Sequence, residues 1–159
     1  MKNILEEIAA RTTERIAKEK AQVSVSELEN RIQEINKNTL QKMTFLQALQ
    51  KDGMSYICEV KKASPSKGLI APDFPYLAIA QEYEQAGASA ISCLTEPFYF
   101  QGSDQYLKEI AATVHIPVLR KDFTVDEYMI YQAKSSGASA VLLICAILDD
   151  GELKAYRQL

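Results

Sequence analysis

Two different rhythms of apolar residues divide the chain. In residues 1–53, apolar positions such as Ile4, Ile8 and Ile16 recur at helical spacing among charged ones. This spacing is typical of amphipathic helices. In residues 54–159, short apolar runs rich in β-formers alternate with helical stretches. We therefore expect an N-terminal helical extension followed by a region of βα units.

The extension is predicted to hold three helices and no strand. Ser26 and Glu29 have the spacing of a capping box, and Thr44 and Gln47 have the same spacing. Each pair therefore marks the expected beginning of a helix. The polar segment 36–42 between these two helices is predicted to be a loop.

Strands and helices alternate in the second region. The predicted elements are strands at about 55–61, 89–94, 117–121 and 140–146, and helices at about 75–86, 103–113 and 125–136. Strand, helix and strand at this spacing imply parallel strands joined by crossover helices, so the fold class is α/β. The run 140–148 is apolar on both faces, as a buried parallel strand should be. Asp149 is expected to begin one more helix.

Composition excludes some classes of protein. The 159 residues are 25% charged and 47% hydrophobic, with a net charge of -3. These values are ordinary for a soluble globular protein, and they give no basis for binding nucleic acid or an anionic membrane. The longest apolar run is too short to span a bilayer. The charged N-terminus is unlike a signal peptide, so we expect a cytoplasmic location.

Cysteine and histidine are too few and too scattered to suggest a disulfide framework or a metal site. Cys58, Cys93 and Cys145 are far apart, and an odd count argues against paired disulfides. Each lies in an apolar run, so we expect all three to be small buried hydrophobes. His115, the one histidine, is expected on a surface loop.

The densest candidate chemistry begins at the end of the first predicted strand. Glu59 and Lys61 are two residues apart, so both side chains point to one face of the strand. They could form a salt bridge at a strand end, or an active-site pair at the carboxyl end of a barrel strand. The loop that follows is rich in hydroxyls and suits a phosphate or carboxylate; its candidate residues are Ser64, Pro65, Ser66, Lys67 and Gly68.

The next two strand ends add aromatic and charged residues. Three aromatics in the loop 95–102 could form a small satellite core or a wall for a flat substrate. At the third strand end, Lys121 could be a general acid if burial and a neighbouring cation, Lys61, lowered its pKa. The two ammonium groups would converge from neighbouring strands, with Glu59 holding either one. Alternatively, residues 120–122 could be a solvated charge cluster.

Four segments together resemble indole-3-glycerol phosphate synthases, enzymes of tryptophan biosynthesis. The segments are Glu59–Gly68, Leu94–Ser103, Val118–Glu127 and Gly137–Ile144, in the order and at the spacing of that family. The helical extension is similar as well. This resemblance implies a TIM (β/α)8 barrel, of which the chain would hold about four βα units as a partial barrel.

The resemblance also implies a carbon–carbon lyase. Its substrate is a phosphorylated small molecule, an anilino-deoxyribulose phosphate, whose ring closes with loss of carbon dioxide and water and without cofactor or metal. Lys121 would be the general acid, Lys61 would contact the substrate's anionic groups, and Glu59 would position both lysines. The implied substrate-binding residues are Ser64, Pro65, Ser66, Phe98, Phe123 and Leu142.

Length is where the chain departs from this family. A complete eight-unit barrel takes about 200 residues or more, so the family's general-base glutamate and most of its phosphate-binding backbone would lie beyond residue 159. Four strands would leave open sheet edges that favour self-association, and we expect negligible turnover. The alternative function is a non-catalytic half-barrel for ligand binding or assembly. Another phosphate-binding barrel, such as an isomerase, fits the architecture but not the motifs.

Overall fold

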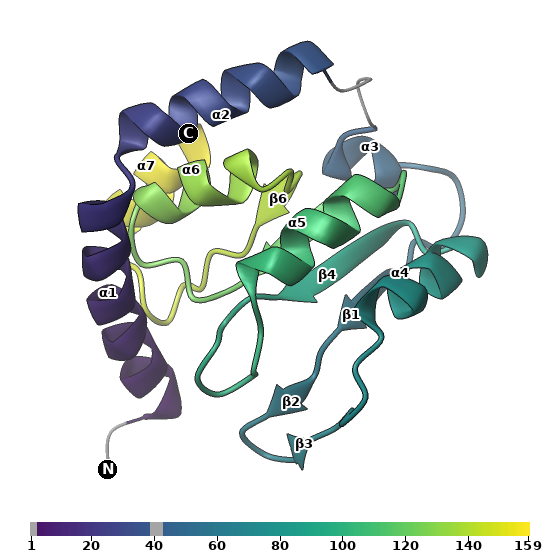
Figure 1. Cartoon of the computed structure of the whole chain (residues 1–159), viewed down its shortest axis with the longest axis horizontal. Helices are drawn as coiled ribbons and strands as arrows, with labels where there is room; N and C mark the ends of the chain where they lie inside the picture. Colours follow the sequence, from purple (N-terminus) through teal and green to yellow (C-terminus); the bar gives the residue numbers. More distant parts are fainter. Residues whose placement is uncertain (1–2, 39–42) are drawn as a thin grey trace.

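A parallel sheet of four strands forms the centre of the computed structural model, which describes residues 3–38 and 43–159. The strands lie in the order β1-β4-β5-β6; Figure 1 labels β1, β4 and β6 of this sheet. Their bounds are β1 Ile57–Val60, β4 Ala90–Leu94, β5 Val118–Lys121 and β6 Ala140–Val141. The α/β class and the four parallel strands predicted from the sequence are confirmed.

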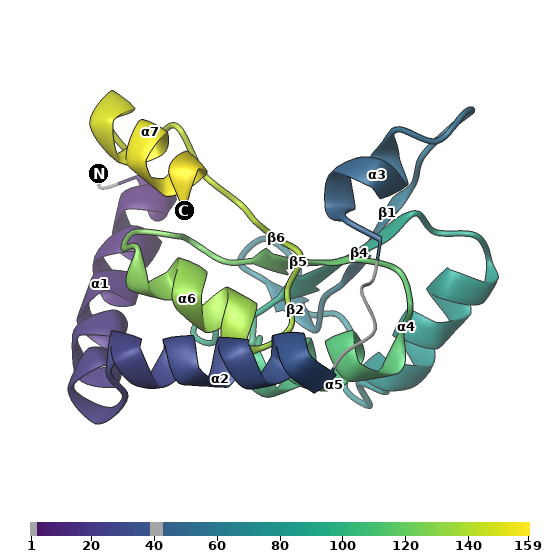
Figure 2. The ribbon, with the colours of Figure 1, turned by 90° about the horizontal axis from the view of Figure 1, so that it is seen from above.

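Crossover helices cover one face of this sheet. They are α4 (Tyr76–Gln85), α5 (Asp104–Thr113) and α6 (Tyr128–Ser135), and Figure 2 shows them on the same side of the strands. Every second strand residue points to this outer face. There the side chains of Val60, Ile91, Cys93 and Val118 pack against Leu107 and Ile110 of α5 and form the main core.

The N-terminal extension forms three helices, as predicted, and the described residues of the extension contain no strand. They are α1 (Ile4–Gln22), α2 (Val25–Asn38) and the short α3 (Phe45–Leu49). Helices α1 and α2 pack on α6, where Ile16 and Leu28 contact Tyr128 and Met129 in a second apolar cluster. None of the helices that the structure describes is long and apolar enough to cross a membrane.

Two details of the extension differ from the prediction. Helix α2 begins before Ser26, and its first turn is capped by Ser24, whose Oγ accepts a hydrogen bond from the Glu27 N–H at 3.2 Å. The expected loop at 36–42 is helical up to Asn38, and residues 39–42 lie outside the described part. The capping box of Thr44 and Gln47 is confirmed.

The fourth strand is shorter than its apolar sequence indicates. It pairs with β5 only at Ala140 and Val141, and the chain then leaves the sheet toward α7 (Asp150–Gln158). β6 is an outer strand with a partner on one side only, so the apolar run is not held in the ladder. Cys145 lies in the part that leaves the sheet and is exposed. Cys58 of the other outer strand, β1, is half-buried, and Cys93 of the central β4 is buried as expected.

The predicted start of the last helix is correct. The Asp149 side chain accepts from the Glu152 N–H, and Glu152 reaches back to the Asp149 N–H, which completes a capping box. His115 is exposed, as expected for a loop residue, and its Nδ1 lies 3.6 Å from Glu84 Oε2.

Candidate active site

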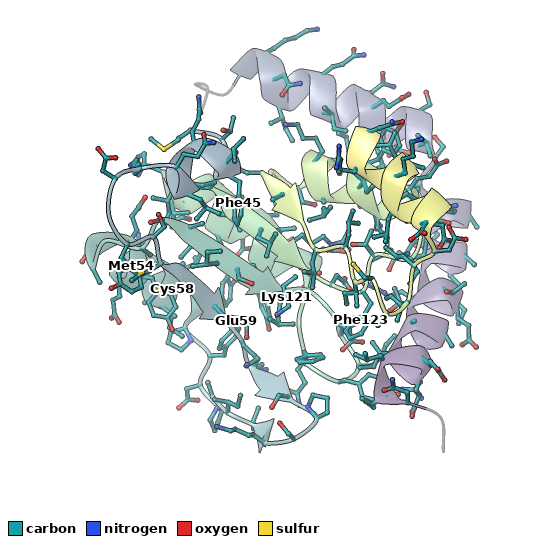
Figure 3. All side chains as sticks on the ribbon, turned by 180° about the vertical axis from the view of Figure 1, so that it is seen from behind. Phe45, Met54, Cys58, Glu59, Lys121 and Phe123 are labelled. Carbon is teal, nitrogen blue, oxygen red and sulfur yellow. The ribbon has the colours of Figure 1, made fainter. Side chains whose placement is uncertain are left out.

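Three charged side chains meet near the carboxyl ends of β1 and β5. Lys121 Nζ donates a hydrogen bond to Glu59 Oε2 at 2.8 Å, and Lys61 Nζ lies 2.8 Å from Glu59 Oε1. The labelled side chains of Glu59 and Lys121 lie beside each other in Figure 3. We name these three residues the open charge cluster, since their side chains remain 29–36% exposed.

Sheet register explains how this cluster forms. Glu59 pairs with Ser92 of β4, and Ser92 pairs with Leu119 of β5. Lys121 lies two residues beyond Leu119, so it projects from the same inner face. The expectation that the two lysines come from neighbouring strands is wrong, because β4 lies between β1 and β5. The long lysine side chain of β5 spans that gap to reach Glu59.

Glu59 is held in its ionised form. Burial alone would raise its pKa, but the hydrogen bonds from Lys121 and Lys61 and their positive charges outweigh burial, so its pKa lies below the ordinary glutamate value. Within the cluster, two ammonium groups therefore share one carboxylate. This leaves one positive charge to attract an anionic ligand.

A cavity of about 570 Å³ lies beside the open charge cluster. Its walls come from the N-terminal half of α1, the loop after β1 and two phenylalanines: the lining residues are Ile4, Leu5, Ile8, Lys61, Ser64, Pro65, Ser66, Lys67, Ile70, Phe100 and Phe123. Such a mixture of apolar walls and a few polar groups is typical of small-molecule sites. The structure thus brings Lys61, Phe123 and the predicted loop residues to one cavity.

Four predicted site residues do not line this cavity: the catalytic candidates Glu59 and Lys121, which lie beside it, and the substrate-binding candidates Phe98 and Leu142. Phe98 is 51% exposed and lies against α1, with the Arg11 guanidinium carbon 5.3 Å from its ring centroid. Leu142 is half-buried and follows the short β6. Phe100, which the sequence did not single out, lines the cavity instead, with its ring centroid 6.5 Å from that of Phe123.

The loop after β1 folds into a small hairpin, which was not predicted from the sequence. Two antiparallel strands form it, β2 (Ala63–Ser64) and β3 (Gly68–Leu69). The Lys67 N–H donates to Ser64 Oγ at 3.2 Å, and Gly68 has a φ of 62°. Glycine adopts this left-handed conformation without strain. The hairpin presents the loop's hydroxyls and Lys67 to the cavity.

A buried glutamate organises the aromatic loop after β4. Glu96 is fully buried, and its carboxylate accepts hydrogen bonds from the N–H groups of Phe98, Tyr99 and Phe100 at 2.7–3.0 Å. The three aromatics do not form a satellite core, because Phe98 is 51% exposed and Phe98 and Tyr99 lie against Arg11 of α1, whereas Phe100 lines the cavity. The aromatic wall for a flat substrate stays a prediction. Nothing in the periodicity marks Glu96 as a buried residue.

Behind the cavity lies a second group of charges, which we name the buried ion network: Arg15, Thr95, Asp104, Arg120 and Asp122. Arg15 Nη2 of α1 donates to Asp122 Oδ2 at 3.0 Å, and the Thr95 hydroxyl donates to the same oxygen at 2.7 Å. Arg120 Nη2 lies 2.9 Å from Asp104 Oδ1. The alternative of a solvated charge cluster is therefore wrong for Arg120 and Asp122, which are 1% and 2% exposed.

This network keeps Asp122 ionised despite its burial. Burial would raise the pKa of Asp122, but the charges of Arg120 and Arg15 and the hydrogen bonds from Thr95 and Arg15 lower it below the ordinary aspartate value. No local pattern predicts the pairing of Asp122 with Arg15, because the two residues are 107 positions apart. In the part of the chain that the structure describes, no group of three or more His, Cys, Asp or Glu residues is placed to hold a metal ion.

Known proteins resemble almost the whole chain. A family model described as indole-3-glycerol phosphate synthase matches residues 5–159. The indole-3-glycerol phosphate synthase of Lacticaseibacillus paracasei is 54% identical over 98% of this chain, and that of Ruminiclostridium cellulolyticum is 53% identical over 96%. A third, from Aliarcobacter butzleri, is 47% identical over 95%.

The match covers only part of each relative. The chain spans 59%, 58% and 57% of the lengths of these three proteins. The parallel sheet, its crossover helices and all of the helical extension from Leu5 onward lie within the matched residues. The chain therefore belongs to the indole-3-glycerol phosphate synthase family, and its βα units form a partial TIM barrel.

Proposed function

We propose that this chain supplies the N-terminal half of an indole-3-glycerol phosphate synthase active site. The substrate would be an anilino-deoxyribulose phosphate, and the reaction would close its ring with loss of carbon dioxide and water. The observation that carries this proposal is the open charge cluster, in which Glu59 bridges Lys61 and Lys121 beside an apolar-walled cavity.

Each member of the cluster has a proposed role. Lys121 protonates the substrate's keto oxygen as the ring closes, because an ammonium group next to a developing alkoxide stabilises it. Lys61, which lines the cavity, binds an anionic group of the substrate. Glu59 holds both ammonium groups in position, and its 2.8 Å contacts to each of them support this role.

The cavity walls suggest how the substrate lies. We place its aromatic ring against Phe123 and Phe100, since an electron-rich ring favours an apolar slot. The hairpin residues Ser64, Pro65 and Ser66 lie across the cavity and offer hydroxyls to an anionic end of the substrate. Phe98 and Leu142 reach the ring only if the bound state differs from this structure, so the ring slot proposed here rests on the two lining phenylalanines.

Turnover and binding test different parts of the proposal. The anilino ring of the substrate is fluorescent, so titration should give saturable binding to the 159-residue chain, and Lys61→Met and Lys121→Met should weaken it. Turnover should be negligible, because the family's general-base glutamate has no counterpart among the cluster residues described above. Absence of saturable binding would contradict the proposed substrate, and rates near those of the longer relatives would contradict the expected inactivity.

We also propose that the 159-residue chain self-associates when studied alone. β1 and β6 are the two outer strands of the sheet, and Ile57 of β1 is 47% exposed. Unpaired strand edges with apolar side chains are templates for pairing with another copy. Light scattering coupled to size exclusion should detect dimers or larger species, whereas a stable folded monomer at high concentration would contradict this proposal.

Given its biosynthetic family, we place the protein in the cytoplasm.

A further inference from the structure

One carboxylate joins the helical extension to the strand end that carries the candidate general acid. Asp122 follows Lys121 directly and precedes Phe123, which lines the cavity. Its Oδ2 accepts from Arg15 of α1 at 3.0 Å and from Thr95 after β4 at 2.7 Å. Its Oδ1 accepts from the Phe123 N–H at 2.8 Å. Both carboxylate oxygens of Asp122 therefore accept hydrogen bonds, and the donors come from α1, from the residue after β4 and from the backbone after β5.

Burial makes this arrangement rigid. The Asp122 side chain is 0% exposed and that of Arg15 is 10% exposed, whereas the lysines of the open charge cluster are 33% and 36% exposed. A buried carboxylate whose oxygens are satisfied by charged and neutral donors has few alternative positions. The Phe123 N–H therefore has a fixed anchor, and the backbone that leads from Lys121 into the ring-binding wall is held at that point.

Helix α1 contributes to the same cavity from the other side. Ile4, Leu5 and Ile8 line the cavity, and Arg15 lies about two turns further along the same helix. The ion pair with Asp122 thus links the helix that forms one wall to the residue that forms the other. A shift of α1 relative to the sheet would therefore displace Phe123 through this ion pair.

We propose that Asp122, paired with Arg15 of α1, is a positioning residue that sets Phe123 and the end of β5 for binding of the substrate's aromatic ring. This inference rests on the proposed function, because it assigns the ring to the Phe123 wall. It assigns Asp122 no contact with the substrate. Its effect passes through the Phe123 backbone and through the docking of α1.

The first test measures the anchor itself and needs no ligand. In the 159-residue chain, the Phe123 amide proton should resonate far downfield, because it donates to a carboxylate. Asp122→Asn should move this signal upfield and alter the contact between the rings of Phe123 and Phe100. Asp104→Asn is the matched control, because it removes one carboxylate from the same network without touching Phe123. An unchanged Phe123 amide in Asp122→Asn, or an equal change in the control, would overturn the proposal.

The second test separates ring binding from anion binding. 2-Aminobenzoate represents the ring half of the proposed substrate, and inorganic phosphate represents the other end. Asp122→Asn should weaken 2-aminobenzoate binding about tenfold while changing phosphate binding less than twofold, because a displaced wall misplaces only the ring. Arg15→Lys, which keeps the charge but not the guanidinium fork, should give a smaller loss in the same direction. Equal losses for both probes would indicate a merely structural role and overturn the proposal.

Two further outcomes remain decisive. If the wild-type chain binds neither probe, the proposed function fails, but the Phe123 amide signal still decides whether Asp122 positions that residue. If Asp122→Asn does not fold, Arg15→Gln replaces it, because the Arg15 side chain is less deeply buried than that of Asp122 and its loss leaves Asp122 its bonds to Thr95 and Phe123. A folded Arg15→Gln chain that binds 2-aminobenzoate as tightly as wild type would contradict the role of α1.

Discussion

Arg120 and Lys121 are adjacent cations on one strand, yet they lie in opposite environments. The Arg120 side chain is 1% exposed and points to the outer face, where it contacts Asp104 and donates to the Met129 carbonyl of α6. The Lys121 side chain is 36% exposed and points to the inner face, toward Glu59. The alternation of a β-strand thus places one positive charge in the buried ion network and the next in the open charge cluster.

The two clusters differ in how their charges balance. In the buried ion network, two arginines face two aspartates, as expected where desolvation makes an uncompensated charge costly. In the open charge cluster, two lysines share one glutamate, and nearby water screens the excess. The charges of the buried ion network therefore balance without a ligand, whereas a bound anion would balance the extra positive charge of the open charge cluster.

Neutralising each of the two adjacent cations tests this difference most strongly. Arg120→Met should lower the free energy of unfolding by about 3–5 kcal/mol, because it removes one of the two arginines that offset the charge of buried Asp122. Lys121→Met should change it by less than about 1 kcal/mol, because that pair is partly exposed. Urea unfolding followed by circular dichroism measures both. Similar losses for the two variants would refute the distinction between the clusters.

Glu96 extends the comparison to a buried carboxylate whose partners are backbone groups. Glu96→Gln keeps the shape of the side chain but replaces one acceptor oxygen by a donor that faces the loop's N–H groups. It should destabilise the chain by about 1–3 kcal/mol, through an unsatisfied buried group. Gln105→Ala, an exposed change in the helix that follows this loop, is the control. Thermal unfolding that is equally unaffected in both variants would show that the Glu96 hydrogen bonds are not needed to hold the loop.

Acid should affect the buried carboxylate in a defined direction. The pKa of Asp122 is lower in the folded chain than its ordinary value, because the positive charges of Arg120 and Arg15 outweigh the effect of burial. Ionised Asp122 therefore stabilises the fold at neutral pH, and this contribution is lost as the pH falls from the ordinary aspartate value through the lowered folded-state pKa. The stability gap between wild type and Asp122→Asn should shrink over that acidic window. Glu59, whose pKa is also lowered, should show the same sign with a smaller effect because it is partly exposed.

Thiol labelling gives the mildest comparison, since it leaves the sequence unchanged. Burial raises the pKa of Cys93 to about 12, so its thiol should not react with iodoacetamide in the native chain at neutral pH. Exposed Cys145 should react readily, and half-buried Cys58 more slowly. Mass spectrometry of the labelled peptides measures this order. Rapid labelling of Cys93 would show that the outer face of the sheet opens to solvent.

Local signals in the sequence predicted much of this molecule. Periodicity located the strands and helices, and the spacing of Glu59 and Lys61 placed both side chains on one face. Long-range pairings were beyond these signals. The bond between Arg15 and Asp122 depends on how α1 docks, which no local pattern specifies. The length of β6 depends likewise on its having a partner on one side only. The strand predicted from the apolar run is therefore longer than β6.

The proposed function depends above all on the binding of an anionic, ring-bearing sugar phosphate at the open charge cluster. The most direct measurement is calorimetric titration of the 159-residue chain with a substrate analogue whose keto carbon is reduced to an alcohol, so that it cannot cyclise. We expect saturable binding, which Lys121→Met should weaken about tenfold, equivalent to about 1.4 kcal/mol. Binding that is equally tight in wild type and Lys121→Met, or no tighter than that of ribose 5-phosphate, would contradict it.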